Sequence, residues 1–94
     1  MTERERSAFL ELKRHIIYEQ QHGKCHFCDA PATELAHRIS QSKGNLRKYG
    51  KGIVHHPLNL LGTCSRCNHL ALIDNRPLQV AQLVHEIVKD ITGV

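Results

Sequence analysis

The sequence HHPLNLLGTCSRCN, residues 55–68, decides how this chain is organised. It ends in a C-x-x-C pair, Cys64 and Cys67, and an equivalent pair, Cys25 and Cys28, lies upstream. Two such turns can bring four thiolates to one tetrahedral zinc ion. Four sulfur ligands fill the coordination sphere and leave no position for water. We therefore expect a structural zinc ion rather than a catalytic one.

Four cysteines could instead form two disulfides, as in a small secreted domain. The first residues, MTERER, are charged and lack the apolar core of a signal peptide. No apolar run approaches the length needed to cross a bilayer, so we expect no membrane partner. We therefore expect an intracellular, cytoplasmic protein, and in that reducing setting paired C-x-x-C motifs indicate metal binding.

Length and charge narrow the class of protein further. A chain of 94 residues predicts a single domain over residues 1–94, with a small core that a metal ion would help to stabilise. The formal net charge of +4 suits a polyanionic partner such as nucleic acid. Many small soluble proteins are equally basic, so charge alone does not decide the partner.

Amphipathic segments at both ends of the chain predict flanking helices. The first runs from Thr2 to about Gln21, and Thr2 and Glu5 fit a capping box. Its apolar stripe is expected to be core or a dimer contact, and comprises Phe9, Leu10, Leu12, Ile16 and Ile17. The second runs from about Pro77 to Ile91 and carries Val80, Leu83, Val84, Ile87, Val88 and Ile91.

The middle of the chain predicts short elements around the zinc ion. Residues 33–39 are expected to form a strand, residues 40–52 a polar loop, and residues 53–56 a second extended segment. A helix is predicted to begin at the second cysteine pair and to run over residues 64–74. Together with the flanking helices these elements make the predicted fold class α+β.

Three polar residues between and beside the cysteine pairs suggest chemistry on a phosphodiester. His37 lies in a short apolar run, and a neutral imidazole suits the role of general base near pH 7. Asn59 could hold that imidazole, through its Nδ1 side or through the adjoining backbone. Asn68 directly follows a zinc ligand, and its amide oxygen is a suitable hard ligand for a divalent ion. Taken singly, each of these residues more often has a purely structural role.

The predicted loop after His37 is rich in positive charge. Its basic residues are Lys43, Arg47, Lys48 and Lys51. Basic side chains close to a catalytic histidine would contact the phosphates of a nucleic acid. The alternative is a solvated loop whose charges only improve solubility.

Residues His37, Asn59 and Asn68, framed by the two cysteine pairs, resemble the HNH endonuclease family with a zinc-bound ββα-metal finger. The resemblance covers about half the chain, from Lys24 to Ala71. It implies a β-hairpin followed by a helix, and cleavage of DNA phosphodiester bonds. It also implies that His37 is the base, that Asn59 orients it, and that Asn68 is a ligand of a catalytic divalent ion.

The chain departs from the family pattern directly before the histidine. The family often has an acidic or histidine metal ligand there, whereas this chain has Ala36, which cannot bind a metal. Asn68 with several waters suits Mg²⁺. A ligand from His55, His56 or His69 would favour a softer ion such as Mn²⁺, Ni²⁺ or Zn²⁺. The histidines at 55 and 56 could equally contact phosphate or cap the end of the extended segment.

Three functional hypotheses follow. The first is an active metal-dependent DNA endonuclease or nickase, acting as a monomer or homodimer. The second is a catalytically impaired relative that binds DNA or inhibits a partner protein. The third is a purely structural zinc module. By analogy with free-standing domains of this kind, the first would suit a phage, a mobile element or a restriction system, and a phage-encoded protein would act in the host cell.

Overall fold

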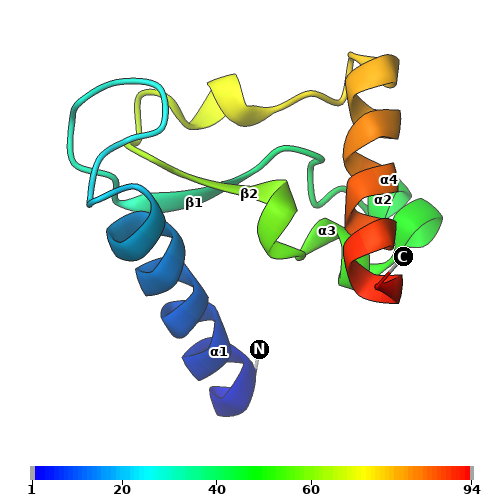
Figure 1. Cartoon of the computed structure of the whole chain (residues 1–94), viewed down its shortest axis with the longest axis horizontal. Coiled ribbons are helices and arrows are strands. Elements are labelled where there is room, and N and C mark those ends of the chain that lie inside the picture. The colour runs from blue at the N-terminus through cyan, green and yellow to red at the C-terminus, as the bar shows by residue number, and fades with distance from the viewer. Residues whose placement is uncertain (1, 94) are drawn as a thin grey trace. The chain divides into compact units, whose positions relative to one another are not determined.

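The computed structural model describes residues 2–93 and has a small α+β fold (Figure 1). Its strands, β1 (Glu34–His37) and β2 (Leu60–Thr63), form a two-stranded antiparallel sheet. The chain divides into two compact units. The first contains the residues up to Ala36 together with Leu61–Leu70, and the second contains His37–Leu60 and the residues from Ala71 onward.

The first unit begins with α1 (Glu3–Arg14), which continues into the π-helix η1 (His15–Gln20). As predicted, Thr2 caps this helix, because its Oγ1 accepts a hydrogen bond from the Glu5 backbone N–H at 3.2 Å. Of the two roles expected for the apolar stripe, core or dimer contact, the core role holds only for its second half. Among the described residues of α1 none is buried, and Phe9 is 37% exposed. Burial begins only at Ile16 and Ile17, within the π-helix.

Gly62 in β2 lies against the end of η1. Gln21 bonds to both backbone groups of Gly62: its Nε2 donates to the carbonyl at 2.9 Å, and its Oε1 accepts from the N–H at 2.8 Å. A Cβ atom at position 62 would lie 2.8 Å from Cγ1 of Ile17. The two segments approach this closely because residue 62 has no side chain.

The core of the second unit is built on α4 (Pro77–Thr92), the predicted C-terminal helix. Pro77 occupies its first turn, and Gly93 ends it in the left-handed conformation at φ 73°. Its buried residues Leu83 and Ile87 pack with Ile39 and Ile73. Around this cluster lie the partly buried side chains of Tyr49, Ile53, Val80 and Val84. Val88 and Ile91 of the predicted stripe are exposed.

The predictions of a loop over 40–52 and an extended segment over 53–56 were wrong. The structure has two helices there, α2 (Lys43–Tyr49) and α3 (Lys51–Val54). Ser42 caps α2 by accepting a hydrogen bond from the Asn45 N–H at 3.1 Å. Gly50, at φ 83°, separates the two helices, since few other residues adopt this conformation. Helix α3 contacts α4 (Figure 1), and Tyr49 at the end of α2 packs against the cluster that contains Leu83 and Ile87.

The helix predicted over 64–74 is reduced to a single 3₁₀ turn, η3 (Asn68–Ala71). Residues 65–67 form the turn of the second cysteine pair. Beyond the turn, the Ile73 N–H donates to the Arg38 carbonyl at 2.9 Å, and a helical Ile73 could not make this contact.

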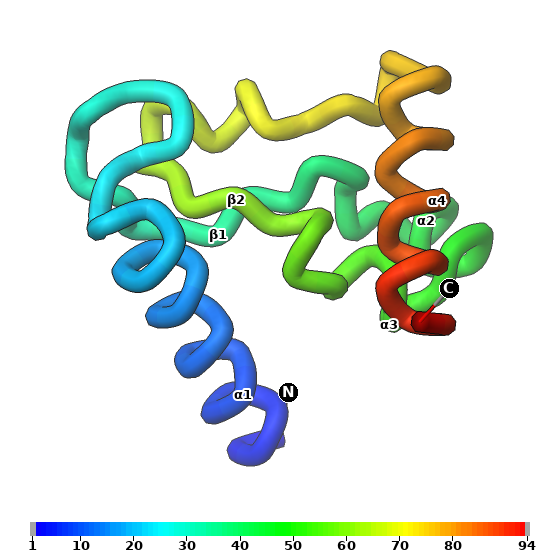
Figure 2. The backbone as a smooth tube through the Cα atoms, viewed as in Figure 1, coloured from blue at the N-terminus to red at the C-terminus, as the bar shows by residue number. Residues whose placement is uncertain are grey.

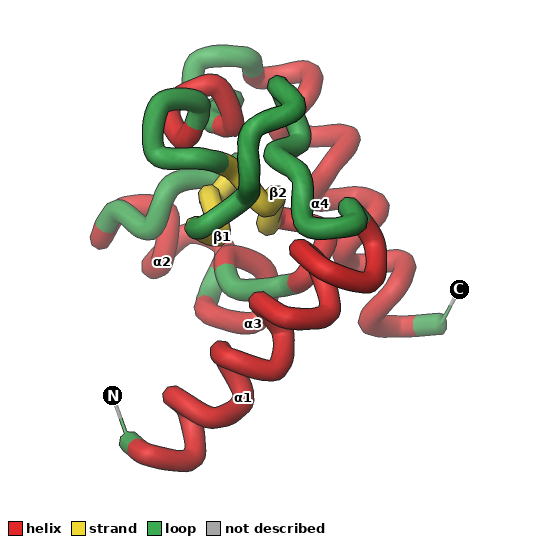
Figure 3. The backbone as a smooth tube through the Cα atoms, turned by 90° about the vertical axis from the view of Figure 1, so that its left-hand side faces the viewer, coloured by secondary structure: helices red, strands yellow, loops and turns green. Residues whose placement is uncertain are grey.

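Figure 3 shows loop and turn, in green, through most of the segment between η1 and β1. Within residues 2–93, no helix combines the length and apolar character that crossing a bilayer requires.

Candidate functional site

The four cysteines come together in the first unit. Their Sγ atoms all lie within 4.8 Å of one another, and two pairs, Cys28–Cys64 and Cys28–Cys67, are 3.7 Å apart. All four are reduced, so the alternative of two disulfides does not describe this structure. Figure 2 shows how the cyan loop before β1 returns next to the segment that follows β2. Four sulfurs at this spacing fit a tetrahedral zinc ion.

The backbone around the cluster favours a negative charge on one sulfur. Burial opposes ionisation of Cys25, but hydrogen bonds from the backbone of Cys64, Phe27 and Cys28 outweigh it and lower the pKa of this thiol to about 6. In contrast, hydrogen bonding to Cys64 and burial raise the pKa of Cys67 to about 12. A second and third thiolate are therefore costly without a cation, and a bound dication would remove this cost.

His37, the predicted base, is the last residue of β1 and is half-buried. Its Nε2 lies 3.2 Å from Nδ1 of His55, and the two rings meet edge to face with centroids 5.3 Å apart. Burial, and secondarily the charge of His55, lowers the pKa of His37 from its usual 6.5 to about 4. The imidazole is therefore neutral near pH 7.

Asn59 is fully buried and does not bond to the imidazole of His37. Its Oδ1 accepts from the Ile39 N–H at 2.7 Å, and its Nδ2 donates to the carbonyls of Ile39 at 3.0 Å and Val54 at 2.7 Å. Its own carbonyl accepts from the Arg38 N–H at 2.8 Å. One amide thus connects the backbone that follows His37 to the backbone that precedes His55. Of the two roles considered for Asn59, the structure has the contact with the adjoining backbone.

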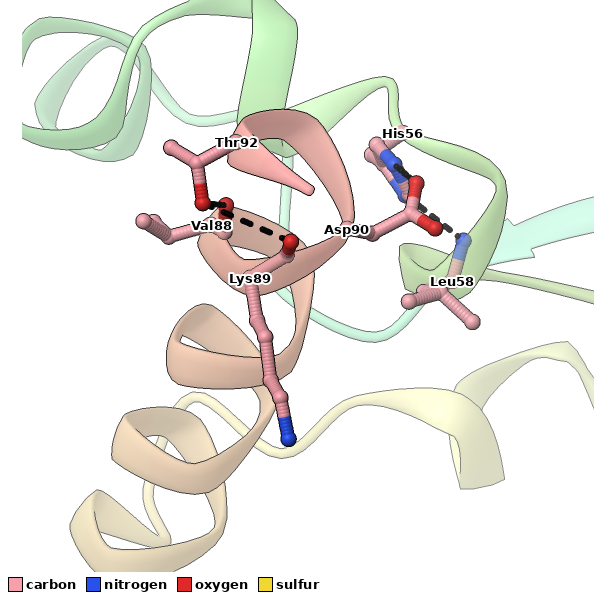
Figure 4. Close-up of polar contacts among 6 residues, drawn as sticks. All are labelled: His56, Leu58, Val88, Lys89, Asp90 and Thr92. Carbon is pink, nitrogen blue, oxygen red and sulfur yellow. Dashed lines mark hydrogen bonds and ion pairs between the residues drawn. The ribbon is translucent and has the colours of Figure 1, made fainter. Parts of the chain in front are cut away.

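His56 was a candidate ligand for a catalytic ion, but both of its ring nitrogens are engaged. Nδ1 accepts from the Leu58 N–H at 3.1 Å, and Nε2 lies 2.9 Å from Oδ2 of Asp90 on α4 (Figure 4). The imidazole caps the short 3₁₀ helix η2 (Pro57–Asn59) and links it to α4. Binding a metal ion would break one of these bonds. The alternative drawn from the sequence, a cap at the end of an extended segment, is replaced by a cap on the 3₁₀ helix that follows, because the residues before His55 form helix α3.

Asn68 lies in the first unit with the cysteines, whereas His37 and Asn59 belong to the second. The Nδ2 of Asn68 donates to Oε2 of Glu34 at 2.9 Å, and both side chains are half-buried. Sequence reasoning missed Glu34. The available signal was its position two residues before Ala36, since alternate side chains of a strand lie on the same face. The ligand role of Asn68 stays a prediction.

The predicted phosphate-binding residues lie on helices of the second unit. Lys43, Arg47 and Lys48 belong to α2, and Lys51 begins α3. All four are exposed. They therefore share a unit with His37, Asn59 and His55, although on helices rather than on the predicted loop.

No protein-family model, curated protein or solved structure matches this chain.

Proposed function

We propose that this chain is a metal-dependent DNA endonuclease or nickase of the HNH type, with a structural zinc ion held by Cys25, Cys28, Cys64 and Cys67. Support comes above all from the position of His37, a half-buried imidazole at the end of β1 whose Nε2 lies 3.2 Å from Nδ1 of His55. Its neighbouring backbone is fixed by the buried amide of Asn59. A general base must be held within reach of the proton that it abstracts, and these contacts hold the imidazole in place.

In this proposal His37 takes a proton from the attacking water. If Nε2 donates its hydrogen to Nδ1 of His55, the Nδ1 of His37 is the nitrogen that accepts the proton. Asn59 acts indirectly, because its bonds to Ile39 and Val54 limit movement of the segments that carry both histidines. We therefore propose a positioning role for Asn59 rather than a chemical one.

A catalytic divalent ion, Mg²⁺, Mn²⁺ or Ni²⁺, would stabilise charge on the phosphate as a Lewis acid. Asn68 is the residue proposed to hold it. Its Oδ1 accepts no hydrogen bond from any residue between 2 and 93, so this oxygen is available to a cation. A hard oxygen donor of this kind fits Mg²⁺ or Mn²⁺ better than a soft metal.

The proposed substrate is DNA, bound through its phosphates. The exposed basic residues Lys43, Arg47, Lys48 and Lys51 support this choice, as does the net charge of +4. With one site per chain, a monomer would nick one strand, and cleavage of both strands would require a homodimer or two events.

The test is a nicking assay on supercoiled plasmid with Mg²⁺, Mn²⁺, Ni²⁺ or Zn²⁺, comparing the wild type with His37→Ala. His85→Ala, which removes an exposed imidazole from α4, is the matched control. We expect nicking by the wild type and the control that depends on added metal, and at least a 100-fold loss in His37→Ala. Nicking that survives in His37→Ala would reject this residue as the base.

A second candidate is a catalytically impaired relative that binds DNA or inhibits a partner protein. The observation that favours it is Ala36, which is 2% exposed and offers no ligand atom where the family often has one. This candidate predicts a gel shift with plasmid DNA or a DNA fragment, and no cleavage with any of the four metals.

A further inference from the structure

The strand β1 carries a carboxylate, Glu34, two residues before Ala36, the position where the HNH pattern often has a metal ligand and this chain has none. Side chains alternate along a strand, so Glu34 and Ala36 project from the same face of β1. Ala36 is buried and has no ligand atom. Glu34 is half-buried and makes no salt bridge to any residue between 2 and 93.

The contact between Glu34 and Asn68 determines which of their oxygens remain available. A carboxylate only accepts hydrogen bonds, so the amide must turn its NH₂ group toward Glu34, as it does at 2.9 Å. This orientation leaves Oδ1 of Asn68 and Oε1 of Glu34 without hydrogen bonds from the described part of the chain. Two hard oxygens are thus held on adjacent, mutually bonded side chains.

From this arrangement we infer that Glu34 and Asn68 together form a binding site for a hard divalent cation, Mg²⁺ or Mn²⁺. Glu34 supplies the negative charge that a neutral amide lacks, and water molecules complete the coordination. One or two protein oxygens with several waters is a usual Mg²⁺ arrangement. The catalytic use of this ion rests on the proposed function, whereas its binding does not.

The experiment measures Mn²⁺ binding to the zinc-loaded protein by electron paramagnetic resonance of free Mn²⁺. Glu34→Gln keeps a hydrogen-bond acceptor for Asn68 and removes the charge. We expect its Kd for Mn²⁺ to rise about ten-fold or more. Glu11→Gln makes the same change at an exposed carboxylate of α1 and is expected to leave the Kd within about two-fold. Zinc content and far-ultraviolet circular dichroism establish that each variant is folded.

A second variant tests the site by gain of affinity. Asn68→Asp adds a second anionic oxygen next to Glu34, so Mn²⁺ should bind more tightly than to the wild type if these oxygens share an ion. Wild-type affinity in Glu34→Gln would overturn the inference, because Glu34 would then only orient Asn68. A wild type without saturable Mn²⁺ binding, or weaker binding in Asn68→Asp, would overturn it as well.

The nicking assay separates this inference from the proposed function. If Mn²⁺ binding depends on Glu34 but the wild type cleaves no plasmid, the cation site stands and the nuclease proposal fails. If the wild type nicks DNA and Glu34→Gln binds Mn²⁺ normally, the nuclease proposal stands and the role of Glu34 fails.

Discussion

The side-chain amide of Asn59 is hydrogen-bonded to both the N–H and the carbonyl of Ile39. The amide therefore forms the pair of hydrogen bonds that a neighbouring backbone segment would form. Asn59 and Ile39 are twenty residues apart in the sequence. A third bond, to the Val54 carbonyl, joins α3 to the same amide. This relationship fixes the backbone on both sides of the His37–His55 contact.

Replacing Asn59 with alanine should destabilise the protein strongly. The substitution leaves three buried backbone groups, on Ile39 and Val54, without partners. We expect a loss of about 3–5 kcal/mol in the free energy of unfolding, measured by urea denaturation. Asn75→Ala, at an exposed turn, should change it by less than about 0.5 kcal/mol. Equal stability of the two variants would show that the Asn59 contacts contribute little.

Gly62 should not tolerate a methyl group. The added Cβ of Gly62→Ala would lie 2.8 Å from Cγ1 of the buried Ile17 and 3.0 Å from Nε2 of Gln21. We expect a loss of about 1–3 kcal/mol, seen as a lower Tm. Gly52→Ala is the control, since a Cβ there meets nothing within 4 Å and helix α3 favours alanine. A Tm for Gly62→Ala at or above that of the control would contradict the close approach.

Zinc removal should unfold the first unit. Each chain is expected to hold one zinc ion, measured by atomic absorption, and a strong chelator should lower both ellipticity and Tm. All four thiols should react with a thiol reagent quickly only after chelation, because the metal protects them. Cys67→Ser should lower the zinc content and the Tm in the same direction. Full stability after complete zinc loss would show that the cysteines have another role.

The pKa of His37 should reflect both the burial of its imidazole and the charge of His55. Because its folded pKa is about 4, below the usual 6.5, the unfolded chain binds more protons between these values. This group therefore stabilises the fold above about pH 6.5, and that contribution is lost as the pH falls toward 4. In His55→Ala the pKa of His37 should rise but stay below 6.5, because burial is the larger cause. Titration of the imidazole carbons by nuclear magnetic resonance measures both values, and an unchanged pKa in His55→Ala would exclude an electrostatic role for His55.

The basic face of α2 should account for the salt dependence of DNA binding. Replacing Lys43, Arg47 and Lys48 with glutamine should lower the slope of log K against log salt by up to about 3. The control replaces Lys24, Arg76 and Lys89 with glutamine. These residues are also exposed, so the control variant loses the same charge. Fluorescence anisotropy with a labelled duplex measures both. Equal slopes for the two triple variants would indicate that only net charge matters.

Local sequence determined the parts of this protein whose signals are short in range. The two C-x-x-C turns, the Thr2 cap and the Pro77-to-Gly93 helix each depend on residues a few positions apart. Patterns of this kind depend only on residues close together in the chain, so the sequence was sufficient to predict them. Helix α2 follows the same rule through its Ser42 cap, but the glycines at 44 and 50 concealed it.

Only the tertiary structure determined the hydrogen-bond partners of residues that lie far apart in the sequence. Ile73 leaves the predicted helix because its N–H bonds to Arg38, and His56 is engaged by Asp90, 34 residues away. The pairing of Glu34 with Asn68 likewise depends on how β1 meets the segment after the second cysteine pair. A buried polar group takes whichever partner the folded chain brings within hydrogen-bond distance, and sequence spacing does not specify that partner.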